Sequence, residues 1–233
     1  MLSRERLEKS GRPVCIDTQS PAIPAAKFMA ERSGLTMTVT VPSLTLSRLR
    51  AETREQHDKI EQTLLLMDDD LTPEKYRRRL EQFYGFYRPV EEQILNDHGP
   101  ISQWLSVEQR RKLPLLETDL KALGQPADTS LPRCVKLPPL ISAAECFGCL
   151  YVLEGATLGG VIISRHIESR LGLSPKSGGA FFCGYGEQTG AMWQQFRAAI
   201  TAFSADAGEQ DVIVASARAT FEALQDWCEE VAR

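Results

Sequence analysis

His57 is the residue whose position in the chain most directly suggests chemistry. It falls on the apolar side of an expected helix, where residues repeat at steps of three and four, namely Leu46, Leu49, Thr53, His57, Ile60 and Leu64. Glu61 lies one helical turn later and can accept the second ring proton, the arrangement that fixes the tautomer of a metal-binding imidazole. A core histidine satisfied by a hydrogen bond is the alternative, and position alone favours it.

Arg50 adds a positive charge to the same side of this helix. It lies two turns before His57, about 10 Å away along the helix axis. That separation resembles the reach from the iron of a haem to its propionates, so an imidazole ligand and a cation spaced in this way suit a flat, dianionic metalloporphyrin. Each pair alone is a weak signal, because charged residues one turn apart commonly decorate helix surfaces.

The segment from Glu154 to Gly160 contains three glycines inside an expected helix. Each glycine costs a helix about 1 kcal/mol relative to alanine, so the sequence needs a reason to keep them. Close packing against another helix is one reason. The functional alternative is a bent helix that lies over a planar ligand and leaves room for dioxygen and water, with Gly155 and Gly159 on one face.

The elements that must position these residues are helices, so we predict an all-α, multi-helical fold. Capping boxes are expected at Ser106 with Gln109 and at Ser142 with Glu145. Proline is expected to open the second helix at Pro73, to kink it at Pro89, and to break the third at Pro114. The expected helices cover residues 43–67, from 72 past 94, 106–124, 142–171, 190–204 and 209–231, with connectors at 125–140 and 178–190.

Residues 1–42 contain prolines and glycines and show no apolar period. We interpret them as a poorly ordered extension or as the product of a mis-assigned start, with Met29 and Met37 as alternative starts. The domain is expected to cover residues 43–233.

Composition limits the classes of function. The chain has 27 Lys and Arg against 31 Asp and Glu, a net charge of −4, which gives no reason to expect nucleic-acid binding. No uninterrupted apolar run of membrane-spanning length and no secretory signal is evident, so we expect no membrane association and a cytoplasmic location. The six cysteines, including Cys146 and Cys149 in a CxxC, are expected to be reduced and buried, because no second CxxC or nearby histidine completes a zinc site.

Two segments resemble motifs of one family, the haem oxygenases. Residues 49–61 (LRAETREQHDKIE) resemble the proximal helix, whose pattern is Leu-(Arg/Lys)-x-x-Thr-x-x-x-His-x-x-x-Glu. Residues 151–160 (YVLEGATLGG) are similar to the distal helix, especially in the bacterial branch associated with phytochrome photoreceptors. The motifs lie about 100 residues apart, as in the family, and the resemblance covers residues 43–231.

This resemblance implies that haem lies between a proximal and a distal helix. His57 would be the axial ligand of the iron, Glu61 would orient its ring, and Arg50 would face the propionates. The distal glycines that pack against the haem would be Gly155, Gly159 and Gly160. Further haem-binding residues would be Thr53, Tyr151 and Arg197, although a solvated surface role is equally consistent with Arg197.

The implied reaction opens haem to biliverdin, carbon monoxide and ferrous iron, using O2 and external electrons. The electron donor would be a ferredoxin, a flavodoxin or a flavin reductase. The phytochrome-like motif suggests the alpha isomer of biliverdin and a bacteriophytochrome as its acceptor. One departure matters: Ala156 stands where the animal enzymes have an Asp that anchors distal water, so backbone and water near Gly155 are the first candidates for the proton route.

Three other functions remain open. A haem carrier or sensor on the same scaffold would bind haem without turnover. A di-iron enzyme needs Glu-x-x-His pairs, but the positions three before the histidines hold Arg54, Leu95 and Ile163. An interaction protein without a cofactor is disfavoured by the costly glycines. The other two histidines are interpreted as a loop residue, His98, and a surface residue, His166.

Overall fold

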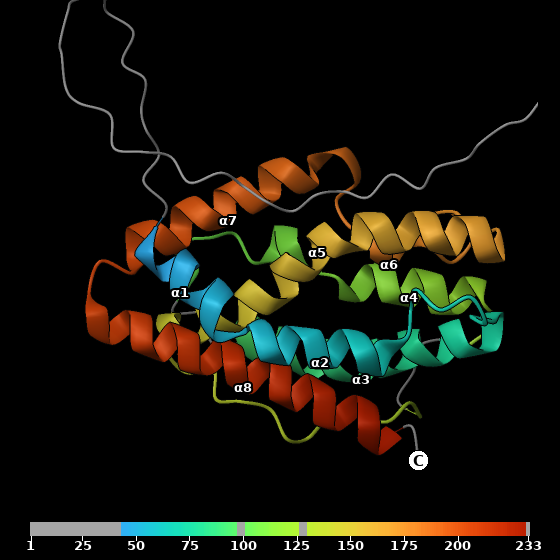
Figure 1. Ribbon diagram of the computed structural model, residues 1–233, viewed down its shortest axis with the longest axis horizontal. Helices are drawn as coiled ribbons and strands as arrows, with labels where there is room; N and C mark the ends of the chain where they lie inside the picture. Colours follow the sequence, from blue (N-terminus) through green and yellow to red (C-terminus); the bar gives the residue numbers. More distant parts are fainter. Residues whose placement is uncertain (1–42, 97–100, 126–129, 232–233) are drawn as a thin grey trace, which may run out of the picture. The chain divides into compact units, whose positions relative to one another are not determined.

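Helices form the regular structure of the computed structural model, which describes residues 43–96, 101–125 and 130–231. No strand occurs in these ranges, so the all-α class is confirmed (Figure 1). The expected extension 1–42, with its alternative starts, and the loop residue His98 lie outside the described residues. The elements are α1 (Leu44–Glu52), α2 (Arg54–Leu64), α3 (Pro73–Asn96), η1 (Glu108–Arg110), α4 (Leu113–Ala122), α5 (Ala143–Leu171), α6 (Ala180–Cys183), η2 (Gly186–Gln188), α7 (Thr189–Phe203) and α8 (Ala207–Val231).

The first expected helix is divided at Thr53. The Thr53 hydroxyl donates to the carbonyl of Leu49 at 2.7 Å, and its backbone leaves the helical region at φ −109°, ψ 5°. A threonine that bonds back to the preceding turn commonly bends a helix. α2 also ends before the expected Met67, because Leu65 adopts the left-handed conformation at φ 50°.

Proline begins helices here more than it breaks them. α3 starts at Pro73 as expected, with the Thr72 hydroxyl accepting from the Lys75 amide, and it continues through Pro89. The break or bend expected near Pro114 is present, but it lies before the proline: η1 ends at Arg110 and α4 begins at Leu113. Pro114 therefore lies in the first turn of α4, where its missing N–H would be unpaired in any case. The capping box expected at Ser106 is wrong, since Val107 is the N-cap of η1 and no side chain caps that turn.

α5 is the central helix of the arrangement. It begins with the expected capping box of Ser142 and Glu145 and ends at Gly172, which is left-handed with φ 67°. It packs against α6, α7 and α8, while α1 and α2 lie along α8. Figure 1 shows α5 bending about midway along its length, the region that contains the glycines 155, 159 and 160.

By length and composition, α5 could also cross a membrane. The expectation from uninterrupted apolar runs missed this helix, because glycines and single polar residues divide its apolar stretches. Half of its most apolar window is buried inside the fold, and the core helix of a soluble protein passes the same test. We therefore treat α5 as weak evidence for membrane association.

Replacing Gly148 with alanine is expected to destabilise the protein by about 3 kcal/mol. A Cβ at this position would lie 2.3 Å from the Ile213 carbonyl of α8 and 2.9 Å from the Ala217 amide, and a helix backbone yields little. Urea denaturation followed by circular dichroism would measure the loss. Gly155→Ala on the same helix is the control: its Cβ would meet nothing within 4 Å, so stability should rise by about 1 kcal/mol. Equal stabilities of the two variants would contradict the α5–α8 packing.

Stability is expected to fall as the pH rises above 9. Burial raises the pKa of the Cys149 and Cys228 thiols from 9.0 to about 12. The folded chain therefore holds two protons that the unfolded chain releases, so the stabilisation is present below pH 9 and is lost between pH 9 and 12. The loss is about 1 kcal/mol per thiol between pH 9 and 10. Urea denaturation with a reductant present would test this, and Cys228→Ala should reduce the loss between pH 9 and 10 by about 1 kcal/mol. A stability that rises over this interval would contradict the prediction.

Candidate functional site

His57 lies on α2 with more than half of its side chain exposed. Thr53 and Ile60, on the same side of the chain, are buried, so the expected apolar face continues past His57 but does not enclose it. The ring is 55% exposed and meets Phe221 of α8 edge-on, with the ring centroids 6.1 Å apart. A histidine this exposed is not a core histidine, which removes the alternative that position alone favoured.

Two carboxylates stand on one side of the His57 ring. The Nδ1 atom lies 3.8 Å from Glu61 Oε2 and 3.9 Å from Asp58 Oδ1. A carboxylate beside Nδ1 favours the tautomer with the proton on that nitrogen, which leaves the lone pair of Nε2 for a metal. The ligand atoms of all three residues also lie within 4.8 Å of one another and could hold an ion directly, although exposed acidic groups are common without one.

Tyr151 of α5 meets the proximal side at the break between α1 and α2. Burial raises the pKa of the Tyr151 hydroxyl, while the neighbouring Thr53 hydroxyl and Arg50 guanidinium lower it. Thr53 itself is buried, whereas Arg50 is exposed, and no ion pair of Arg50 occurs within the described ranges. Arg50, Thr53 and Tyr151, which the sequence predicts to bind haem, are therefore neighbours in the fold.

Arg197 lies on α7, which comes close to the same region. The Trp193 ring, one turn before Arg197, is 6.1 Å from the Tyr151 ring and stacks on Phe196. α7 is also tied to α1, because the Thr45 and Ser204 hydroxyls are 2.6 Å apart. Arg197 is exposed. α1, α5 and α7 thus pack together, with Tyr151 against Trp193, and Arg197 lies one turn further along α7.

The three distal glycines do not share one environment. A Cβ added at Gly155 or Gly159 would meet nothing within 4 Å. At Gly160 it would lie 2.7 Å from the Phe182 carbonyl, so this glycine is required for packing against α6. Leu158 and Ile162 are 42% and 62% exposed along the same stretch. This part of α5 combines absent side chains with exposed apolar ones, which suits contact with a flat apolar ligand.

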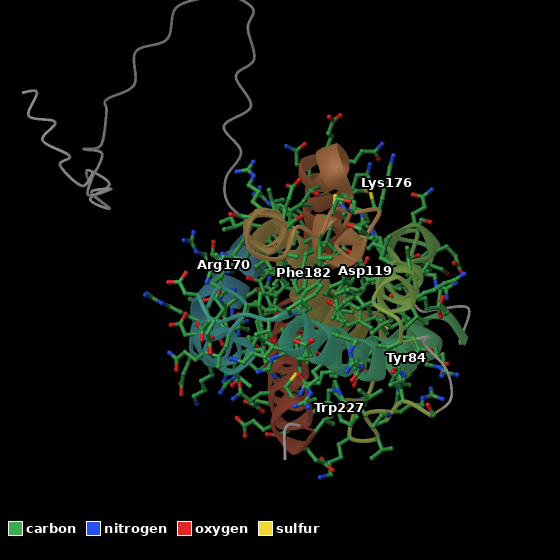
Figure 2. All side chains as sticks on the ribbon, turned by 90° about the vertical axis from the view of Figure 1, so that its right-hand side faces the viewer. Tyr84, Asp119, Arg170, Lys176, Phe182 and Trp227 are labelled. Atoms are coloured by element: carbon green, nitrogen blue, oxygen red, sulfur yellow. The ribbon has the colours of Figure 1, made fainter. Side chains whose placement is uncertain are left out.

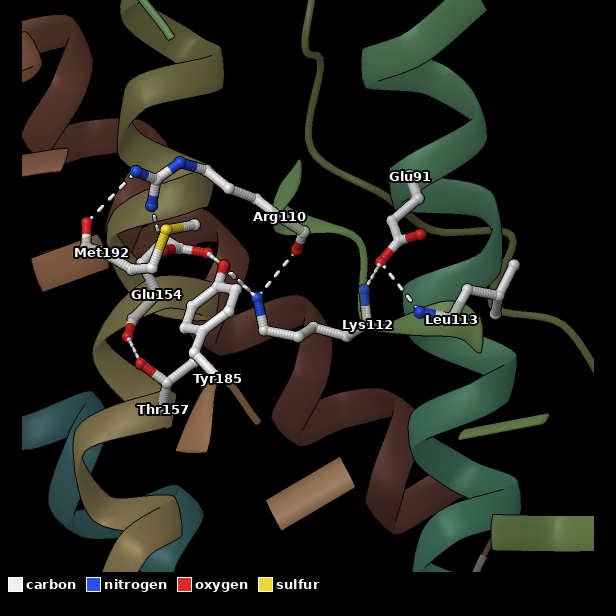
Figure 3. A network of polar contacts seen from close by, with 8 residues as sticks. All are labelled: Glu91, Arg110, Lys112, Leu113, Glu154, Thr157, Tyr185 and Met192. Carbon is white, nitrogen blue, oxygen red and sulfur yellow. Dashed lines mark hydrogen bonds and ion pairs between the residues drawn. The ribbon is translucent and has the colours of Figure 1, made fainter. Parts of the chain in front are cut away.

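A buried polar cluster lies around Glu154, immediately before Gly155, and the sequence analysis missed it (Figure 3). The Glu154 carboxylate accepts from Arg110, from Lys112 Nζ at 3.1 Å and from the Tyr185 hydroxyl at 2.6 Å. Lys112 Nζ also donates to the Tyr185 oxygen at 2.6 Å, and Arg110 donates to the Met192 carbonyl at 3.1 Å. Burial lowers the pKa of Lys112, although Glu154 opposes this shift, and burial raises the pKa of Tyr185.

Glu91 of α3 provides a second buried carboxylate beside this cluster. It accepts from the backbone amides of Lys112 at 2.6 Å and Leu113 at 3.1 Å, and burial raises its pKa (Figure 3). A cavity of about 10 Å³ is lined in part by Glu91, Arg110 and Glu154. That volume holds about one water molecule.

The sequence did carry a signal for the cluster. Glu154 follows the apolar run Leu150–Leu153 inside a helix, and a carboxylate there is costly unless it is paired. Arg110, Arg111 and Lys112 form the only run of three cations in the described part of the chain other than Arg77–Arg79. Nothing in the spacing indicates that these two segments meet.

The connector at 178–190, which contains α6, is hydrogen-bonded to α3 and α4. The buried Asp119 carboxylate of α4 accepts from the amides of Ala180 at 2.8 Å and Phe181 at 2.7 Å. The Tyr76 hydroxyl of α3 donates to the Gly178 carbonyl at 2.8 Å. Asp119 and Phe182 both lie among the helices in Figure 2. These bonds fix α6, and α6 in turn supports α5 at Gly160.

Comparison with known proteins gives one family. The family model described as heme oxygenase matches residues 44–230. A heme oxygenase from Xanthomonas campestris pv. campestris (strain 8004) is 32% identical over 158 residues, which cover 66% of this chain and 87% of that protein.

Solved structures give the same architecture. The NO- and CO-bound heme oxygenase from Neisseria meningitidis aligns with a TM-score of 0.69 at 20% identity, covering 80% of this chain and 91% of the other. The heme oxygenase from Leptospira interrogans aligns with a TM-score of 0.67 at 21% identity, covering 81% and 99%. At these identities the two structures show the fold.

Proposed function

The chain belongs to the haem oxygenase family, and from this premise we propose that it opens haem to biliverdin, carbon monoxide and ferrous iron at the region between His57 and the Gly155–Gly159 face of α5. Haem is the substrate, O2 is the co-substrate, and the electrons come from an external donor. The observation that carries the proposal is the exposed His57 ring, whose Nδ1 atom lies 3.8 Å from Glu61 Oε2. Near it on the same helix side, Thr53 contacts Tyr151 of α5.

Each residue has a distinct task in this proposal. His57 Nε2 binds the iron, and Glu61 holds the ring in the required orientation. The exposed guanidinium groups of Arg50 and Arg197 pair with the two propionates. Tyr151, whose hydroxyl lies beside Thr53 and Arg50, supports the same edge of the substrate.

The proposed distal side is defined by the absence of large and acidic side chains at positions 155, 156 and 159. Gly155 and Gly159 leave space for dioxygen over the substrate, and Ala156 provides no acid. The nearest carboxylate in sequence, Glu154, is buried and fully engaged with Arg110, Lys112 and Tyr185. Water, held by hydrogen bonds to the backbone near Gly155, would then deliver a proton taken from solvent. A strong acid in contact with the oxygen would favour cleavage of the O–O bond before the ring is attacked.

The biliverdin isomer and the partners extend the proposal. The phytochrome-like form of residues 151–160 favours the alpha isomer and a bacteriophytochrome as its acceptor. A ferredoxin, a flavodoxin or a flavin reductase would supply electrons, and the cytoplasm is the compartment that fits these partners.

One experiment separates this function from a haem carrier on the same scaffold. Haem is added to the protein, the absorption spectrum is recorded, and ascorbate or a ferredoxin system is supplied in air. An enzyme loses the Soret band, releases carbon monoxide and yields one bilin, which chromatography identifies. A Soret band that persists without carbon monoxide would leave only binding.

Arg50→Glu is expected to weaken haem binding about tenfold or to change the biliverdin isomer. The new carboxylate would repel a propionate that the guanidinium attracts. Haem titration and chromatography of the product measure the two effects. Arg78→Glu, an exposed change of equal charge on α3, is the control. Unchanged affinity and an unchanged isomer in Arg50→Glu would remove the propionate role.

A further inference from the structure

We propose that Glu154 is a positioning residue, which fixes the rotation and height of the middle of α5 so that Gly155 and Gly159 face the substrate. The inference rests on the proposed function in one respect, namely that this glycine face covers haem. It concerns the buried side of the helix, behind that face.

Glycine removes the contacts that normally hold a helix in register. Side chains that interlock with neighbouring helices define the rotation of a packed helix. Around Gly155 and Gly159 no atom lies where a Cβ would make contact, so these two residues add no interlocking side chains to those that hold α5 in place. Successive residues stand about 100° apart around a helix, so a rotation of about 60° would bring Leu158, or about 100° in the other direction Ala156, to the place of Gly155.

The Glu154 carboxylate supplies the missing constraint from the residue immediately before Gly155. Its donors come from η1 through Arg110, from the start of α4 through Lys112, and from the segment after α6 through Tyr185 (Figure 3). Arg110 extends the link to α7 at the Met192 carbonyl. The Glu154 side chain therefore ties the glycine turn to three segments by directional bonds, and Arg110 extends this link to α7.

Charge makes this clamp resistant to opening. Glu154, Arg110 and Lys112 are each less than 5% exposed, and a buried ion that loses its partner cannot be solvated by water. Rotation of α5 would separate Glu154 from both cations at once. The ion pairs therefore disfavour rotation of the Gly155–Gly159 turn of α5.

The cluster is closed, which argues for positioning rather than proton transfer. Within the described ranges, the buried side-chain polar atoms without a partner are Gln56 Oε1 and Gln225 Oε1, both away from the cluster. A proton relay to the distal face would need the chain of hydrogen bonds to continue from the cluster toward Gly155. The bonds of Glu154, Arg110, Lys112 and Tyr185 run instead to one another and to the Arg110 and Met192 carbonyls.

Tyr185→Phe tests the clamp with the smallest change. It removes one donor to Glu154 and one acceptor for Lys112 and keeps the ring. In the haem-free protein we expect amide hydrogen exchange of residues 153–160 to become about tenfold faster. Tyr76→Phe, which also removes a buried hydroxyl that holds the 178–190 connector, should change these amides less than twofold.

The haem complex provides the second measurement. In Tyr185→Phe the haem dissociation constant should stay within twofold, because the residues proposed to carry the affinity, His57, Arg50 and Arg197, lie on other helices. Turnover should fall about tenfold, and the bilin product should become a mixture of isomers. Glu154→Gln should show the same pattern more strongly. Unchanged exchange, or equal changes in Tyr185→Phe and Tyr76→Phe, would overturn the clamp. Faster exchange with normal turnover and a single isomer would overturn the positioning role. A wild-type protein without turnover would refute the proposed function, while the exchange experiment would still decide whether the clamp exists.

Discussion

Replacing His57 with alanine is expected to abolish the haem-iron ligation of the wild-type protein and to lower bilin formation about 100-fold or more. The Nε2 atom is the proposed iron ligand, and alanine offers no replacement. The absorption spectrum of the ferric complex and the rate of bilin formation measure the effect. Because the side chain is 55% exposed, the free energy of unfolding should change by less than about 0.5 kcal/mol. A large loss of activity without a loss of stability identifies a ligand and not a packing residue.

Two further variants sharpen this test. Glu61→Gln keeps the shape of the side chain and removes its charge, so a milder loss of about tenfold is expected if Glu61 orients the ring. Asp58→Asn distinguishes a haem ligand from a site for a bare ion, since only the latter uses the Asp58 carboxylate as a ligand. Free imidazole should restore part of the spectrum in His57→Ala. Normal turnover in that variant would remove the axial assignment.

Local chemistry explains why most helices could be predicted from the sequence. The capping box of Ser142 and Glu145, Pro73 in a first turn and Gly172 after the last turn act within a few residues, and all three behave as expected. At Pro114 the expected break is present, but its position differs. The short turn η1 ends at Arg110, so the helix is interrupted before the proline, and Pro114 stands in the first turn of α4.

In the candidate site, too, residues close together in the sequence could be predicted, whereas contacts between distant segments could not. The spacing of Arg50, His57 and Glu61 lies within one stretch of chain, and the sequence suffices to propose it. The partners of Glu154 lie 44, 42 and 31 positions away, at Arg110, Lys112 and Tyr185. No periodic pattern reports such contacts, because they arise only when separate helices pack. The sequence could indicate that a buried carboxylate needs partners, but not which ones.

The glycines show how packing separates identical residues. Gly155, Gly159 and Gly160 stand in one motif, and helix period alone puts the first two on a shared face. Only the fold reveals that a Cβ added at Gly160 would lie 2.7 Å from the Phe182 carbonyl oxygen, whereas a Cβ at Gly155 or Gly159 would meet nothing within 4 Å. The sequence therefore predicts the motif, and the fold assigns packing to one member and an accessible face to the others.

Gly159→Leu is accordingly expected to leave the fold intact and to block the reaction. A Cβ at this position would meet nothing within 4 Å, and leucine favours a helix over glycine by about 1 kcal/mol, so thermal stability should hold or rise. The same side chain would project from the face that we propose covers haem. Turnover should fall about 100-fold, as expected when a distal space of a few ångströms is filled and reacting groups are displaced. Rapid mixing with reductant in air, followed by bilin and carbon monoxide analysis, gives the rate.

Ser169→Leu controls for the added apolar surface, because it introduces the same side chain at an exposed position further along α5. It should leave turnover unchanged. Gly160→Ala provides the opposite pattern, since its Cβ would press on a backbone carbonyl and cost stability before it affects the substrate. A Gly159→Leu protein that turns over haem normally would show that the open face of α5 is not the distal wall. In that case the exposed apolar residues beside it, Leu158 and Ile162, would need another ligand to explain them.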